Sequence, residues 1–208
     1  MTGCFVVVAD KTLGLDEALE RLERYPTGTP AIYDYPGPGE PSSITAHEIR
    51  RTRAVSSRIS AVEGDWFISL ARTAPWTQVD GDLRDADPGQ CGGLYDSMLR
   101  LYDHFAAIAP RGINTAKISK VLHLKRPTQF PILDSRLVRT CGKAAAHEAA
   151  KYARRGHKRM YWAAIRCDLM KSSEALAELR RRMADHPTAR VRALQAISDL
   201  RLHDMLTW

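Results

Sequence analysis

The sequence predicts a mostly α-helical protein, a multi-helix domain with at most one short strand near the N-terminus. Three observations support this fold class. Apolar residues recur three or four positions apart in several segments, most clearly over Leu94–Ile108. Clusters of proline and glycine separate these segments. The β-prone run Phe5–Ala9 is too short for more than a single strand.

Length and composition favour one domain. The chain has 208 residues, of which 44% are apolar and 26% are charged, so it can bury a core of ordinary size. We expect a single, mostly helical domain over residues 1–208. Its expected parts are N-terminal helices with a Pro/Gly loop (1–110), a central core (111–143) and C-terminal helices (144–208).

Local signals place the elements of the first part. Leu15–Arg24 is expected to be a helix with Glu–Arg pairs four residues apart. The Pro- and Gly-rich stretch 25–43 is expected to be a loop, with Tyr33 and Tyr35 held against the surface. Thr45–Glu48 fits a capping box that begins the next helix.

The helices after residue 110 follow from the same periodicity. Leu94–Ile108 is stopped by Pro110. The further expected helices are Thr115–Leu124, Ser135–Cys141, Ala144–Ala153, Tyr161–Met170, one capped by Ser172 or Ser173 and running toward Met183, and one from about Thr188 to Trp208.

The stretch 112–142 is the most informative part of the chain. Gly112 and Asn114 tolerate the backbone of a tight turn into the helix that follows. Pro127 ends that helix, because the residue before a proline avoids the α region. Phe130–Leu133 is an apolar extended link, and Asp134 is a natural N-cap for the next helix.

Charge is concentrated in the same region. Residues 111–159 hold thirteen Lys and Arg against two acids, a local net charge of +11, whereas the whole chain is +7. The rest of the chain is therefore net acidic. One strongly basic third indicates a polyanionic partner, although such a run also occurs as a merely solvated face.

Residue spacing argues against several kinds of site. The cysteines lie far apart with no CxxC pair, which argues against a zinc ribbon or iron–sulfur loop and fits a reducing cytoplasm. The seven histidines form no metal-binding pattern. No apolar run approaches the roughly 20 residues of a membrane span. We expect a cytoplasmic protein with no metal, cofactor or membrane partner.

The central stretch resembles the signature of the helix-hairpin-helix DNA glycosylase superfamily. Gly112-Ile113-Asn114 resembles the Gly-hydrophobic-Gly hairpin, and Pro131–Arg139 resembles the segment that carries the family's aspartate. Asp134 lies 22 residues after Gly112, as in that family. The resemblance implies a glycosylase-like fold, DNA as the partner, a role in DNA repair and Asp134 as the catalytic carboxylate, which would stabilise an oxocarbenium centre or activate water.

Two departures limit the chemistry that the resemblance implies. Asn114 stands where the family has the second hairpin glycine. Ala116 stands where bifunctional members carry their Schiff-base lysine, and Lys117 is one step along the helix, about 100° away. The resemblance therefore implies a monofunctional, water-using N-glycosidase without lyase activity, if the protein is an enzyme at all.

The same resemblance assigns a nucleic-acid interface. A hairpin with open backbone N–H groups at a helix N-terminus can hold a phosphate, and nearby cations add a salt-dependent attraction. The residues expected to contact nucleic acid are Gly112, Ile113, Asn114, Thr115, Lys117, Lys120, Lys125, Arg126, Arg136 and Arg139.

The chain also resembles an uncharacterised actinobacterial family over most of its length. The shared features are Tyr33-Asp34, the core from Lys120 to Pro127, and the ending Leu200–Trp208. This resemblance brings no known activity.

Three functions stay open from the sequence. The protein is a DNA-acting enzyme centred on Asp134, a non-catalytic nucleic-acid-binding module, or an interaction module whose basic third binds an acidic partner. A pocket beside Asp134 would favour the first, and weak dependence of DNA affinity on salt would count against the first two.

Overall fold

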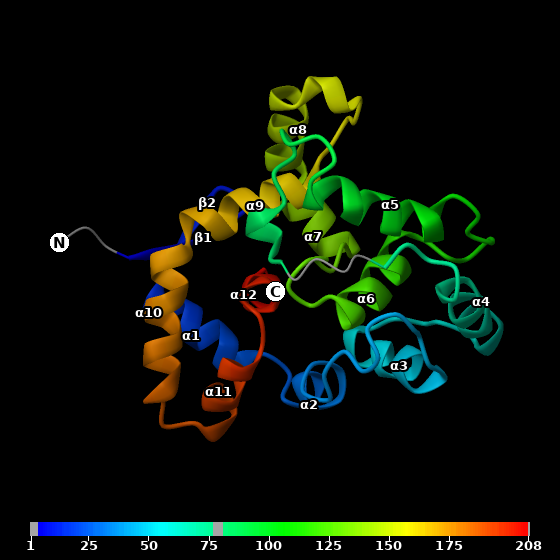
Figure 1. Ribbon diagram of the computed structural model, residues 1–208. Helices are drawn as coiled ribbons and strands as arrows, with labels where there is room; N and C mark the ends of the chain where they lie inside the picture. The colour runs from blue at the N-terminus through cyan, green and yellow to red at the C-terminus, as the bar shows by residue number, and fades with distance from the viewer. Residues whose placement is uncertain (1–3, 77–80, 208) are drawn as a thin grey trace. The chain divides into compact units, whose positions relative to one another are not determined.

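The computed structural model describes residues 4–76 and 81–207, and these residues form a mostly helical protein with a two-stranded sheet (Figure 1). The predicted mostly α-helical fold class is confirmed, whereas the expectation of at most one strand is wrong. The residues divide into two compact units: unit 1 comprises Met1–Thr27 and Ser135–Trp208, and unit 2 comprises Gly28–Asp134. The expectation of one domain over 1–208 stays a prediction.

Unit 1 begins with a hairpin and continues with helices from both ends of the chain. Its elements are β1 (Phe5–Val8), β2 (Lys11–Gly14), α1 (Leu15–Arg24), α7 (Ser135–Thr140), α8 (Gly142–Lys151), the 3₁₀ helix η3 (Ala153–Arg155), α9 (Tyr161–Lys171), α10 (Ser173–Ala184), α11 (Ala189–Ala193), the 3₁₀ helix η4 (Leu194–Ala196) and α12 (Asp199–Leu206).

The second strand, β2, was not predicted by the sequence pattern. It pairs antiparallel with β1, with Val6 opposite Leu13. Ala9 and Asp10 make the two-residue turn with φ of 51° and 64°. Such turns are usually marked by Asn-Gly or Asp-Gly, so Ala-Asp gives no signal that the strand reverses.

The hairpin is attached to the C-terminal helices, as Figure 1 shows with β1 beside α9 and α10. The Val7 N–H donates to Ser172 Oγ at 2.7 Å, and the Ala9 N–H donates to Asp168 Oδ2 at 2.7 Å. Ser172 is the residue before α10, as expected, but its hydroxyl makes no capping bond to that helix. Its partner lies 165 residues away in the sequence, which no local pattern can reveal.

Helix α12 is buried together with several charged groups. The last expected helix is divided into α11, η4 and α12; its expected end, Trp208, lies outside the described residues. Arg201 is 1% exposed, binds Asp204 on the same helix, and donates to the Tyr25 hydroxyl at 3.0 Å. His203 Nε2 lies 3.2 Å from Asp168 Oδ2.

The regular elements of unit 2 are all helices over its described residues. Its elements are α2 (Gly28–Tyr33), α3 (Ala46–Arg51), the 3₁₀ helix η1 (Thr52–Val55), α4 (Ala61–Ala71), the 3₁₀ helix η2 (Leu83–Asp85), α5 (Leu94–Ala106) and α6 (Thr115–Lys125). The predicted capping box of α3 is present, because the Thr45 and Glu48 side chains each bind the other's backbone N–H.

The expected loop over 25–43 contains a short helix, α2. Tyr33 is fully buried at its end, as expected, and donates to the Lys120 carbonyl at 2.6 Å. Tyr35 is 42% exposed, so the expectation that it is held down is wrong. The end of α2 and the turn after it are held by Arg51, which is 5% exposed and donates to the carbonyls of Ile32, Tyr33 and Gly37.

Aromatic side chains fill the contact between α4 and α5. Phe67 and Phe105 are fully buried, with ring centroids 5.9 Å apart, and Trp66 and Trp76 pack edge-on or tilted against Phe105. The 3,4 spacing correctly places Phe105 in the core. Ile108, the last member of that spacing, follows the end of α5 and is 63% exposed.

We predict that Phe67→Ala destabilises the protein by about 3–5 kcal/mol, because a fully buried ring is replaced by a cavity among aromatic neighbours. Val62→Ala on the same helix is the matched control, since Val62 is 79% exposed, and it should change stability by less than about 0.5 kcal/mol. Urea unfolding of both variants measures the difference. Equal effects would contradict this description of the core.

Candidate nucleic-acid interface

The turn before α6 has the backbone that the sequence predicts. Gly112 has φ of +103°, and a Cβ built there would lie 2.9 Å from Glu63 Oε1. A side chain at this position would meet both a strained backbone and a carboxylate. Ile113 is 8% exposed, and its N–H donates to the Pro110 carbonyl at 3.1 Å. The turn is therefore anchored through Ile113 and requires glycine at 112.

Asn114 does not take the left-handed conformation that a second hairpin glycine would allow. Its φ is −124°, and its side chain caps α6 by accepting from the Lys117 N–H at 3.0 Å. Asparagine is among the preferred N-cap residues, which explains its place here. Thr115, the first residue of α6, is exposed, and its hydroxyl accepts from Tyr102 at 3.0 Å.

Lys117 is neutralised inside unit 2. Its Nζ lies 2.5 Å from Glu63 Oε1, and both side chains are less than one-fifth exposed. Burial alone would raise the pKa of Glu63, but hydrogen bonds from Lys117 and Ser60 outweigh it and lower that pKa. The carboxylate therefore contributes stability above its unfolded pKa and loses it as the pH falls through the lower folded value.

Two further predicted phosphate contacts are buried. Lys120 is 6% exposed and Lys125 is 2% exposed. Lys125 Nζ forms an ion pair with Glu48 and donates to the Pro38 carbonyl at 2.5 Å. In this conformation both residues lie inside unit 2, so they do not offer their charge to a ligand in solvent.

Arg126 is half-buried and turned toward its own unit. Its Nη1 donates to the Pro41 carbonyl at 2.9 Å, and its guanidinium carbon lies 5.7 Å from the centre of the Trp76 ring. The type of a residue gives its charge, but the sequence around it does not reveal which group its side chain will contact in the folded protein. Phosphate contact by the α6 cations stays a prediction, and the structure gives Lys117, Lys125 and Arg126 partners within the protein.

Asp134 is half-buried and directly precedes α7, so the predicted start of that helix is correct. It is the last residue of unit 2, and α7 is the first element of unit 1 after it. Its predicted catalytic role is not tested by its position.

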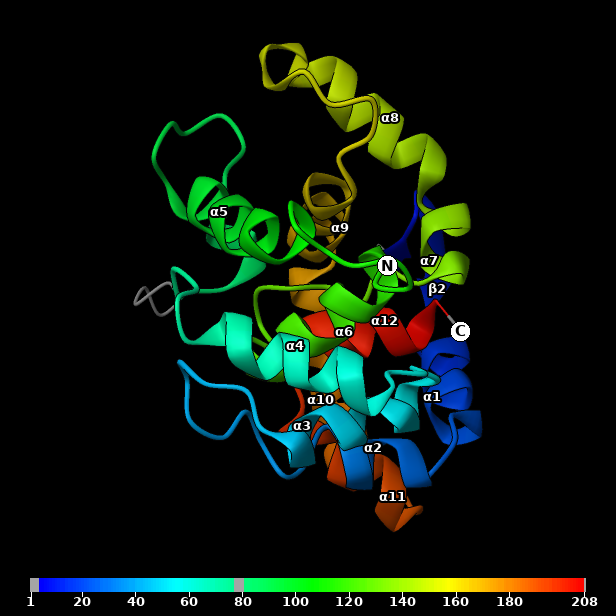
Figure 2. The ribbon, with the colours of Figure 1, turned by 90° about the vertical axis from the view of Figure 1, so that its right-hand side faces the viewer.

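The exposed cations of the predicted interface lie on α7 and continue onto α8. Hydrogen bonds with helical spacing carry across the junction, because the Cys141 N–H donates to Leu137 and the Cys141 carbonyl accepts from Ala145, both at 2.8 Å. Figure 2 shows α8 following α7. Exposed basic side chains recur three or four residues apart along these helices and into η3: Arg136, Arg139, Lys143, His147, Lys151 and Arg154. We call this set the basic stripe.

The other side of the same two helices is apolar and buried. Leu137, Cys141 and Ala145 are at most 1% exposed. The Met160 N–H, at the start of α9, donates to the Ala145 carbonyl at 2.9 Å. Because helix positions three and four apart share a face, burial of one side leaves the cations together on the opposite one.

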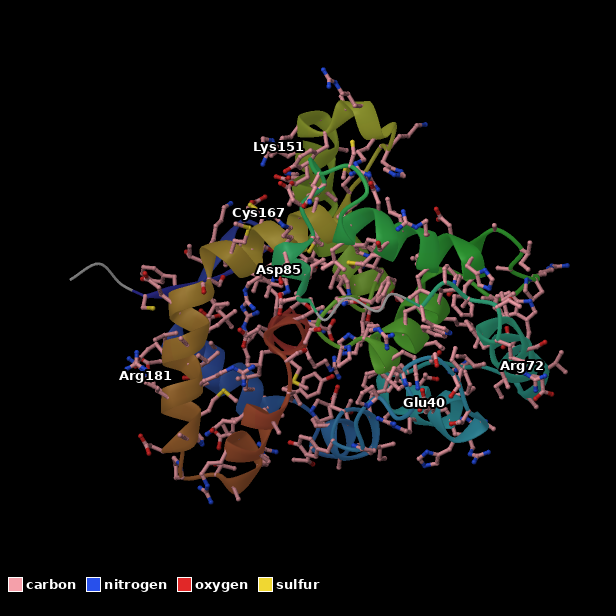
Figure 3. All side chains as sticks on the ribbon, viewed as in Figure 1. Glu40, Arg72, Asp85, Lys151, Cys167 and Arg181 are labelled. Carbon is pink, nitrogen blue, oxygen red and sulfur yellow. The ribbon has the colours of Figure 1, made fainter. Side chains whose placement is uncertain are left out.

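One acid lies on this segment, and it does not cancel the basic stripe. Between residues 135 and 166 the sequence has nine Lys and Arg and a single carboxylate, Glu148. Glu148 is 7% exposed and lies 3.8 Å from the Nζ of Lys151, whose pKa it raises. Lys151, labelled in Figure 3 at the end of α8, is itself 56% exposed.

Cys141 is not a candidate nucleophile. It is fully buried, and burial, together with the carboxylates of Asp168, Asp10 and Asp204, raises its pKa to about 12. A thiol with this pKa carries almost no thiolate at neutral pH.

Within residues 4–76 and 81–207, no three His, Cys, Asp or Glu side chains come together as a metal site. Over the same residues, no helix has both the length and the apolar character needed to cross a bilayer.

The fold and site define a mostly helical protein with a basic helical face. Residues 70–208, more than half of the chain, match the model of a family described as a family of unknown function (DUF6308). The chain therefore belongs to this family, in agreement with the expected resemblance to an uncharacterised one. No curated protein and no solved structure matches the chain. The resemblance to helix-hairpin-helix glycosylases stays a prediction.

Two members of the basic stripe, Arg136 and Arg139, are predicted from the glycosylase-like segment of the sequence. Lys143, Lys151 and Arg154 contribute to the local net charge but are not predicted as contacts. The signal was present, because these residues keep the helical spacing across the expected break after Cys141.

We predict that Lys125→Met destabilises the protein by about 3–5 kcal/mol, since it leaves the buried Glu48 carboxylate without its cation. Adding Glu48→Gln removes that charge while keeping a side chain able to bind the Thr45 N–H, and should recover roughly half of the loss. Denaturant unfolding of both variants and of Glu48→Gln alone completes the cycle. Additive effects would contradict the buried pair.

Proposed function

We propose that this protein binds nucleic acid through the basic stripe on α7, α8 and η3. The observation that carries the proposal is the alignment of exposed cations on one helical face, opposed by a single buried acid on that segment. The cations of α6 are directed into unit 2, so the stripe is the stronger electrostatic surface of the basic third.

The dimensions of the stripe suit a phosphate backbone. From Arg136 to Lys151 the helices span roughly 22 Å at 1.5 Å per residue, and successive Lys and Arg of the stripe on this span lie roughly 4.5, 6 and 12 Å apart along the axis. Arginine and lysine at this spacing can each neutralise a phosphate and release its counterions. Binding through such contacts is strong at low salt and weakens as salt increases.

The proposed recognition is independent of base sequence. The described aromatic residues of this segment, Tyr152, Tyr161 and Trp162, are half-buried or buried, so they do not form an exposed platform on which unpaired bases stack. Contacts to phosphates fix position but carry no sequence information. We therefore propose duplex DNA as the partner, with an acidic protein as the alternative that the test must exclude.

A second candidate function is a monofunctional N-glycosidase that uses Asp134. The observation that favours it is the placement of a half-buried carboxylate directly before α7, the helix that begins the stripe. In this proposal the carboxylate acts on an extruded base by stabilising positive charge or activating water. The non-catalytic module is the alternative.

The test of the first proposal is duplex DNA binding across a salt series. The variant Arg139→Gln/Lys143→Gln/Arg154→Gln should bind at least about tenfold more weakly at low salt, and the slope of log K against log salt should fall by about 2–3. Fluorescence anisotropy with labelled duplex and single-stranded DNA measures both quantities.

The control variant removes three cations elsewhere on unit 1. Arg24→Gln/Lys171→Gln/Arg181→Gln has the same net charge, and all three residues are exposed; Arg181 is labelled on α10 in Figure 3. It should keep nearly all of the affinity. An equal loss in both variants would show attraction by net charge alone, and no binding at low salt would overturn the proposal.

The test of the second proposal uses Asp134→Asn. If the protein releases a base from any member of a panel of damaged duplexes, the variant should release it at least about 100-fold more slowly. Its DNA affinity should stay within about threefold of the native value, because the carboxylate is not part of the stripe. Base release is measured by strand cleavage in alkali. Unchanged release would exclude Asp134 as the catalytic group.

A further inference from the structure

A depression on unit 2 brings arginine and serine side chains together. It is open, has a volume of about 800 Å³, and lies where η1 leads into α4. The residues that line it are Arg53, Ser56, Ser57, Arg58, Ile59 and Ser60. None of them belongs to the basic stripe or to the turn before α6.

The two arginines of the depression have no charged partner among the residues that the structure describes. Arg53 and Arg58 are exposed, and neither forms an ion pair or a side-chain hydrogen bond among the residues that the structure describes. Arg51, two residues before Arg53, shows the contrast, because it is buried and bound to three backbone carbonyls. A guanidinium group offers a planar fork of N–H donors that matches the oxygens of a phosphate.

The hydroxyl of Ser57 is an independent observation that indicates a ligand at this depression. The residue is 4% exposed, and its Oγ has no hydrogen-bond partner among the described residues. Buried hydroxyls are nearly always satisfied, so one that is not calls for an explanation. Donation to an oxygen of a bound anion would satisfy it.

The carboxylate near the depression does not oppose an anion. Glu63 lies three residues after Ser60, and its Oε2 accepts from the Ser60 N–H at 2.7 Å. Its Oε1 is paired with Lys117 at 2.5 Å, which balances its charge. Ser60 Oγ accepts from the Glu63 N–H at 3.3 Å, so its hydroxyl hydrogen is available to a ligand.

We propose that this depression binds a phosphate group, with Arg53 and Arg58 neutralising its charge and the hydroxyls of Ser57 and Ser60 donating to its oxygens. Its volume lies within the range of small-molecule sites, so it admits a nucleotide as well as inorganic phosphate. The site is separate from the basic stripe and does not depend on the function proposed for it.

Thermal unfolding of the full chain in sodium phosphate, compared with sodium chloride at equal ionic strength, tests the site. A ligand that binds the folded state raises the Tm with the logarithm of its concentration. The variant Arg53→Gln/Arg58→Gln should lose the phosphate-specific part of this rise. Phosphate also stabilises proteins by exclusion from their surface, and that part should be the same in every variant.

Two further variants make the test specific. Arg50→Gln/Arg72→Gln removes two exposed arginines of unit 2 that do not line the depression, and should keep the native response; Arg72 is labelled in Figure 3. Ser57→Ala should leave the protein at least as stable without phosphate, since it removes an unsatisfied hydroxyl, and should weaken phosphate binding by about tenfold. A phosphate response equal in the native chain and in Arg53→Gln/Arg58→Gln would overturn the proposal.

Titration calorimetry then identifies the source of the phosphate group. Inorganic phosphate, a nucleoside monophosphate and a short duplex are each added to the native chain and to Arg53→Gln/Arg58→Gln. Tighter binding of the monophosphate, lost in the variant, would assign the site to nucleotides. DNA binding that is lost in this variant but kept in Arg139→Gln/Lys143→Gln/Arg154→Gln would assign it to the nucleic-acid backbone. If all three probes bind Arg53→Gln/Arg58→Gln as tightly as they bind the native chain, the proposed site is overturned.

Discussion

Unit 2 depends on two cations that are buried under a stretch rich in proline and glycine. Lys125 and Arg51 are 2% and 5% exposed, and each is held by oxygen atoms of the protein. Lys125 pairs with Glu48 and binds the Pro38 carbonyl, while Arg51 binds carbonyls at and after the end of α2. A buried charge without a partner is costly, so each cation requires its oxygens to stay in place. The stretch is thereby held by hydrogen bonds from buried cations to its backbone carbonyls, in addition to the apolar packing of Tyr33.

This arrangement divides the basic third of the chain into two kinds of cation. Those on and just after α6 stabilise the fold, since Lys117, Lys125 and Arg126 all bind oxygens of unit 2. Those on α7, α8 and η3 are exposed along one face, because the other face of these helices packs inward. The net charge counted over residues 111–159 does not distinguish buried, paired cations from exposed ones. Their difference is the reason that the proposed interface centres on the basic stripe rather than on the turn at Gly112.

The family match is consistent with this division but does not extend to the whole chain. It covers 70–208, which includes α6, the basic stripe and Asp134. The phosphate depression lies before residue 70 and outside the match. Glu48, the partner of Lys125, also lies outside it. A residue inside the match, Lys125, is therefore paired in this chain with a residue outside it.

The sequence by itself determined the fold class, most helices and their local signals. The capping box at Thr45–Glu48, the positive φ of the turn at Gly112 and the start of α7 after Asp134 are local features, which the types of neighbouring residues indicate. Tertiary structure decided which cations are buried: Lys125 meets Glu48 from 77 residues away, and Ser172 meets Val7 from 165 away. Helical periodicity reports on which side of a helix a residue lies. It does not report which side another element will cover, and that choice separates a structural cation from one available to a ligand.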